Sequence, residues 1–189
     1  MTTKKILTLA TLLTLWMGAW AQSIDGIWKA DQKTLEKLEI EQEENMQMDF
    51  IFFFKGNEME LRFDVSVTEP ELGKLDFRCS LPGTYTRSGN QLKNMELNKD
   101  KLQFTMLPST QFNDEITKEH FTDENSKRLF IALINATIEK EMAGSMKESM
   151  SSMADAFREA TIDIKQITDT RLVLGNEEME LSFDKKVLK

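Results

Sequence analysis

Cysteine and histidine are almost absent from this chain. Its 189 residues include one cysteine, Cys79, and one histidine, His120. A single cysteine excludes an internal disulfide, and a single histidine leaves a nucleophilic triad or a histidine-based metal site without its partners. Cys79 alternates in phase with Leu75, Phe77 and Leu81, so we expect a small buried side chain. The sequence therefore predicts no catalytic residue, no metal site, no cofactor and no enzymatic activity.

Positive charge is also in short supply. Lys and Arg total 24 against 32 Asp and Glu, which gives a formal net charge of −8. Nucleic acids and anionic membranes both require a Lys/Arg surface, so neither is an expected partner. Glycine and proline are few, at 8 and 3, and 40% of the residues are hydrophobic. This composition and length indicate one globular domain without low-complexity tracts.

The N-terminus has the three parts of a signal peptide. Lys4 and Lys5 precede an apolar stretch at residues 6–17, and Ala19-Trp20-Ala21 is a small-x-small cleavage site. We therefore predict a signal peptide at residues 1–21 and a single mature domain at residues 22–189. The apolar run is short for an uncleaved anchor, and no cysteine follows it for lipid attachment. The mature protein is expected to be periplasmic or extracellular, without stable membrane insertion.

Alternating apolar side chains predict a series of strands. Met59, Leu61, Phe63, Val65 and Val67 alternate with polar residues, and Gly56-Asn57 before them suits a two-residue hairpin turn. Further strands are expected at residues 24–30, 46–55, 74–87, 91–98 and 101–107, with a bend at Pro82-Gly83 and tight turns at Gly89-Asn90 and Lys99-Asp100. Strands joined in this way form an antiparallel meander.

The period then changes to that of a helix. Between residues 123 and 159, apolar side chains recur every three or four positions. A single helix of this length would measure about 52 Å, whereas a ten-residue strand measures about 33 Å. Because Gly144 offers a break and residues 145–148 fit a capping box, we predict two helices, at residues 123–143 and 145–159.

The last strands close the predicted sheet. Residues 175–184 nearly repeat residues 56–64, with one residue inserted, and predict a hairpin with a final strand at residues 178–187. That strand would pair with the first strand and remove the open edges. The predicted class is mainly β (α+β): an antiparallel meander closed into a barrel of about 8–10 strands. A two-helix insertion precedes the last three strands.

These features together resemble a known family. The signal sequence, the Gly-x-Trp strand of Gly26 and Trp28, the Gly83-Thr84-Tyr85 strand before a Gly-Asn turn and the closing strand are similar to lipocalin-like (calycin-type) barrels exported by Bacteroides-type bacteria. The resemblance covers most of the mature chain, which departs from true lipocalins by lacking their disulfide. It implies a cup for a small apolar ligand.

Aromatic and methionine side chains are the candidate ligand site. We expect an aromatic interior covered by a Met-rich helical lid that binds a small hydrophobic or amphipathic molecule. The predicted ligand-binding residues are Trp28, Phe50, Phe52, Phe54, Phe63, Phe77, Tyr85, Met142, Met146, Met150, Met153, Phe157 and Phe183. Alternatively, the helices plug a filled barrel, and the chain is a non-enzymatic envelope protein that contacts another protein. A hydrolase on the same scaffold is the third hypothesis.

Overall fold

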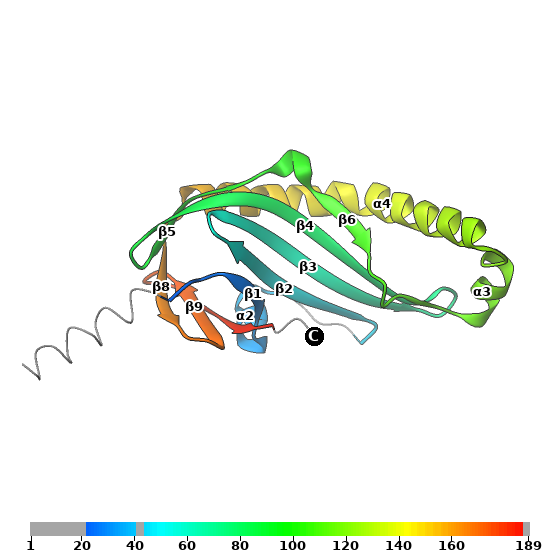
Figure 1. Cartoon of the computed structure of the whole chain (residues 1–189), viewed down its shortest axis with the longest axis horizontal. Helices are drawn as coiled ribbons and strands as arrows, with labels where there is room; N and C mark the ends of the chain where they lie inside the picture. The colour runs from blue at the N-terminus through cyan, green and yellow to red at the C-terminus, as the bar shows by residue number, and fades with distance from the viewer. Residues whose placement is uncertain (1–21, 41–43, 187–189) are drawn as a thin grey trace, which may run out of the picture.

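The computed structural model describes residues 22–40 and 44–186, and for residues 138–139 and 141–149 it describes the backbone alone. The predicted signal peptide lies outside the described residues. Within them, ten strands form one antiparallel sheet (Figure 1). The strands are β1 Gly26–Ala30, β2 Met46–Lys55, β3 Glu58–Glu69, β4 Gly73–Ser88, β5 Gln91–Leu97, β6 Gln103–Met106, β7 Gln111–Phe112, β8 Ile162–Ile167, β9 Arg171–Gly175 and β10 Glu180–Lys185.

Eight of these strands close into a barrel, as predicted. Their order is β3-β2-β1-β10-β9-β8-β5-β4, and β4 pairs back onto β3 along its length. The predicted contact between the first and last strands is present, with Ala30 opposite Phe183. The chain is therefore a mainly β protein whose two terminal strands complete the ring.

Turn chemistry explains the tight hairpins. Gly56 and Gly89 have φ angles of +63° and +60°, and they join β2 to β3 and β4 to β5. Such angles favour glycine, so both hairpins were predictable from local sequence. Gly83 has a different role, because an added Cβ atom there would lie 2.4 Å from the Glu96 carbonyl oxygen. Strand β4 continues through Pro82-Gly83, and the lack of a side chain at Gly83 lets the backbone of β5 approach the backbone of β4 closely.

Strands β5 and β6 do not form the predicted hairpin with each other. Both pair with β4, with Ser88 opposite Gln91 at one end and Phe77 opposite Met106 at the other. The short 3-10 helix η1, Lys99–Lys101, interrupts what is otherwise one continuous edge. Because β4 has sixteen residues, it is long enough to accept both partners in sequence.

The helical insertion is present, but its predicted division is wrong. Helix α3 spans Asp114–His120, and helix α4 spans Glu124–Glu159 without a break at Gly144. The 36 residues of α4 measure about 54 Å. The sixteen residues of β4 measure about 53 Å, so α4 is about as long as this strand. Helix α4 packs against β5 and β6, and Figure 1 shows it running alongside the sheet with α3 at one end.

Helix α2, at Gln32–Lys37, packs against strand β10. Asp31 caps its first turn by accepting a hydrogen bond from the Thr34 amide at 2.9 Å. The Thr34 hydroxyl donates to the Ser182 carbonyl at 3.0 Å, and the Ser182 amide donates back to that hydroxyl at 2.7 Å. These bonds hold α2 against β10, beside the closure of the ring.

Candidate functional site

Most of the predicted aromatic site is packed core. Nine of its residues are at most 6% exposed and belong to one buried cluster: Trp28, Phe50, Phe52, Phe54, Phe63, Phe77, Tyr85, Met150 and Phe183. The ring of Phe50 lies 5.2 Å from that of Phe63 and 6.0 Å from that of Phe183, measured between centroids. These contacts are in the range of favourable aromatic pairs, so the rings fill this part of the interior.

The polar atoms of the two amphipathic aromatics are also used inside the fold. The Trp28 indole Nε1 donates to the Ile24 carbonyl at 2.7 Å, and the Tyr85 hydroxyl donates to the Gly56 carbonyl at 2.7 Å. Lys185 Nζ lies 5.0 Å from the centroid of the Trp28 ring. Neither Trp28 nor Tyr85 therefore offers its polar group to a ligand.

The end of α4 covers the remaining opening of the barrel. Met150 and Ala154 are buried in the core, and Met153 and Phe157 are half-buried. The Phe157 ring packs edge-on against that of Phe52, with centroids 5.7 Å apart. Two of the predicted methionines, Met150 and Met153, therefore pack against the barrel. Met142 and Met146 belong to the same helix, but their side chains lie outside the described ones.

A pocket of about 220 Å³ remains between this helix end and the strands β8, β9 and β10. It brings together Phe52, Met153 and Phe157 of the predicted site. Its other lining residues are Ala156, Ala160, Thr161, Ile162, Leu174, Gly175, Asn176, Met179 and Leu181. None of these described residues carries a charge. We refer to this cavity as the mouth pocket.

The β9–β10 loop forms one rim of the mouth pocket. The predicted strand start at residue 178 is wrong, because β10 begins at Glu180 and four residues, 176–179, form the loop. Asn176 Oδ1 accepts hydrogen bonds from the amides of Glu178 and Met179 at 2.9 and 2.8 Å. The loop leaves Met179 44% exposed at the pocket. Residues 175–184 contain one residue more than the similar segment 56–64, and this insertion was the sequence feature that could have predicted the longer loop.

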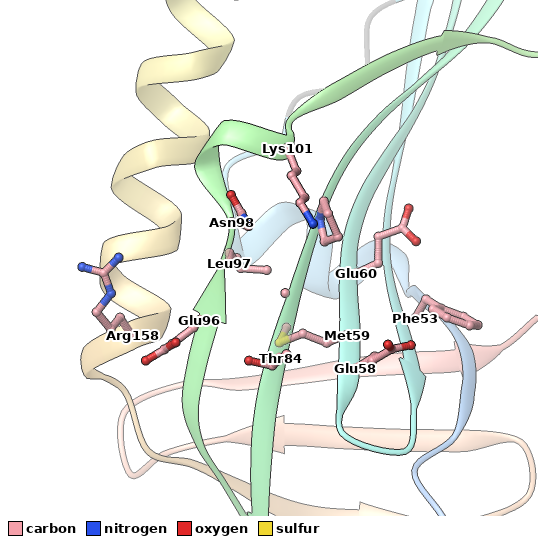
Figure 2. A pocket seen from close by; sticks show the side chains of 12 residues that line it. Phe53, Glu58, Met59, Glu60, Thr84, Glu96, Leu97, Asn98, Lys101 and Arg158 are labelled. Carbon is pink, nitrogen blue, oxygen red and sulfur yellow. The ribbon is translucent and has the colours of Figure 1, made fainter.

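A larger, polar groove lies on the outside of β3, β4 and β5 (Figure 2). It measures about 660 Å³ and is lined by carboxylates of Glu58, Glu60 and Glu96, with Arg158 of α4 beside Glu96 at one end. Glu60 is already held in a two-point ion pair with Arg62, at 2.8 and 2.7 Å. The groove is a mixed-charge surface and lacks the uncharged, mostly apolar lining of the mouth pocket.

The remaining reactive groups are engaged in the fold. The His120 ring stacks on Phe130 with centroids 4.6 Å apart, at the end of α3. Burial raises the pKa of the Cys79 thiol to about 11, which makes it a poor nucleophile. Among the described residues, no group of His, Cys, Asp and Glu has the arrangement of a metal site. No described helix is both long and apolar enough to cross a membrane.

Comparison with known proteins does not assign this chain to a family. No protein-family model and no curated protein matches its sequence.

Proposed function

We propose that this chain is an exported lipocalin-like protein that binds a small apolar or amphipathic ligand in the mouth pocket. The observation that carries this proposal is an uncharged pocket on a barrel whose aromatic interior is otherwise packed. Ligand sites are typically concave and mostly apolar, with a few placed polar groups. The mouth pocket has this character, with Thr161 and Asn176 as its polar side chains.

The size of the pocket limits the ligand. Drug-sized ligands occupy pockets of roughly 300–1,000 Å³, so about 220 Å³ favours a smaller molecule. Met153, Phe157 and Leu181 are half-buried, and Met179 is exposed, so the lining is not locked into a close-packed core. Unbranched methionine side chains adapt to variable shapes. These properties support a site that takes an aliphatic chain or a small aromatic molecule.

The N-terminal sequence supports the export part of the proposal. Residues 1–21 combine Lys4-Lys5, an apolar run and a small-x-small site, which is the pattern of a secretory signal. A ligand-binding protein in the envelope would meet apolar molecules outside the cytoplasm. Fractionation of cells that express the full chain tests this part directly, and retention of the uncleaved chain in the cytoplasm would contradict it.

The binding proposal is tested with N-phenyl-1-naphthylamine, an uncharged probe that fluoresces in apolar surroundings. We expect saturable binding to the wild-type chain and at least about tenfold weaker binding to Ala156→Trp, since the indole would occupy the pocket. Ala132→Trp is the matched control, because Ala132 is exposed on the same helix and lies outside the pocket lining. Absence of saturable binding, or equal binding by Ala156→Trp, would contradict the proposal.

A filled barrel that contacts another protein is the second candidate. Leu129 and Leu133 favour it, because they lie one helical turn apart on α4 and are 73% and 63% exposed. Large apolar side chains that share an exposed helix face are typical of interaction surfaces. If the probe does not bind, pull-down from the envelope of the source cells tests this candidate. A chain that remains monomeric and recovers no partner there would count against it.

A further inference from the structure

We infer that the mouth pocket selects an uncharged ligand whose head group accepts hydrogen bonds, and that it discriminates against carboxylates. This inference rests on the proposed ligand-binding function and narrows it to a chemical class, such as an aliphatic alcohol, ketone or ether. Its basis is the pocket lining, in which none of the described residues carries a charge.

A carboxylate would find no counter-ion in the pocket. Three cations on adjoining elements are already paired with other carboxylates. Arg158 lines the outer groove and lies 3.6 Å from Asp155, Lys165 lies 3.4 Å from Asp163, and Arg171 lies 3.2 Å from Asp31, in each case between nitrogen and oxygen atoms. An ionised carboxylate that leaves water without a partner loses far more solvation than a hydroxyl group does.

The charges around the mouth pocket also disfavour a ligand whose carboxylate stays in water outside the pocket. Glu177 and Glu178 lie in the β9–β10 loop, Glu180 begins β10, and Glu159 ends α4. All four side chains belong to exposed residues adjacent in sequence to the pocket lining. Arg158, next to Phe157, and Lys37, whose ammonium donates to the Glu180 carbonyl at 2.6 Å, offset only part of this charge. The remaining excess of negative charge around the opening repels ligands of the same sign. An anionic amphipath is therefore disfavoured whether its head group enters the pocket or remains at the mouth.

The polar atoms that remain available favour an acceptor on the ligand. Asn176 Oδ1 is occupied by the amides of Glu178 and Met179, at 2.9 and 2.8 Å. Within the described part of the chain, its Nδ2 amide group keeps two N–H donors for a ligand. Thr161 adds a hydroxyl at the pocket wall. A hydroxyl, carbonyl or ether oxygen can accept from these donors without bringing a charge.

The test compares 1-octanol with octanoate, which share one aliphatic chain and differ in head-group charge at neutral pH. Each is titrated against the full mature chain carrying bound N-phenyl-1-naphthylamine, and displacement is followed by fluorescence. We expect octanol to displace the probe at a concentration at least about tenfold lower than octanoate. In Thr161→Lys, which adds a counter-ion at the pocket wall, we expect octanoate to bind at least about tenfold more tightly than to wild type.

The control variant is Gln103→Lys, which adds the same charge at an exposed position on β6, outside the pocket lining. An equal gain of octanoate affinity in this variant would trace the effect to overall charge and overturn the inference. Wild-type protein that binds octanoate as tightly as octanol would also overturn it, as would probe binding without displacement by octanol, and in both cases the binding proposal would stand. Failure of the probe itself to bind would overturn the proposed function together with the inference.

Discussion

Cys79 shows what the barrel interior does to a single ionisable residue. Its side chain is fully buried, and in the sheet it lies opposite Phe63 of β3 and Phe104 of β6. Burial disfavours the thiolate and raises the pKa of Cys79 to about 11. The unfolded chain has an ordinary thiol with a pKa of about 8.5. Between these two values the unfolded chain loses a proton that the folded protein retains.

Alkaline pH should therefore destabilise the protein through Cys79. A raised folded-state pKa contributes stability that is complete below the unfolded pKa and is lost as the pH rises toward about 11. We expect the free energy of unfolding to fall by roughly 1–2 kcal/mol from this residue between about pH 8 and pH 10. Urea denaturation of wild type and Cys79→Ala across this range isolates the effect. The variant should be less stable than wild type at pH 8 and should lose less of its free energy of unfolding by pH 10. Parallel pH profiles of the two proteins would contradict this prediction.

At the level of the element, the C-terminal part of α4 is the part whose side chains enter the barrel core. Met150 is 3% exposed there, whereas Leu133 in the N-terminal half is 63% exposed. We expect Met150→Ala to lower the free energy of unfolding by about 2–5 kcal/mol, because it removes a buried side chain. Leu133→Ala makes a related truncation on the same helix and should change it by less than about 0.5 kcal/mol. Urea denaturation compares the two, and equal losses would show that α4 is not attached in this way.

The elements that were predictable from sequence are those fixed by local chemistry. The hairpin at Gly56 needs only a glycine at positive φ and two alternating strands beside it. The continuity of α4 through Gly144 was not predictable from the same information. A glycine within a helix costs only about 1 kcal/mol relative to alanine, which by itself does not end a helix of 36 residues. The pairing of β5 and β6 with one strand likewise depends on the length of β4, a non-local property.

The candidate site was predictable in part for the same reason. Alternation identified Phe50, Phe52 and Phe54 as inward-facing, and all three are buried. It did not show that Phe52 reaches a cavity while Phe50 is surrounded by rings. That difference arises where the end of α4 meets the β9–β10 loop, and Met179 joins the site only through that contact.

At the level of the whole molecule, the ring is closed by strands from the two ends of the described chain. Trp28 on β1 lies opposite Phe52 of β2 and Lys185 of β10, so its ring sits at this closure. Trp28 is the one tryptophan after residue 21, since the others are Trp16 and Trp20. In a chain that begins at residue 22, tryptophan fluorescence therefore reports on the closure, while far-UV circular dichroism reports on all strands and helices.

A closed ring should unfold as one unit, because opening any seam exposes the shared aromatic core. Phe183 is fully buried beside Phe50 and Phe52, with ring centroids 6.0 and 5.4 Å away. We expect Phe183→Ala to lower the free energy of unfolding by about 3–5 kcal/mol. The fluorescence and circular dichroism transitions should shift together in urea and remain coincident. Glu180→Ala, an exposed change on the same strand, should leave both within about 0.5 kcal/mol of wild type. If only the fluorescence transition moved in Phe183→Ala, the terminal strands β1 and β10 would unfold as a separate unit from the long strands. The mouth pocket, which lies between α4 and strands β8–β10, would then open without unfolding of the whole barrel.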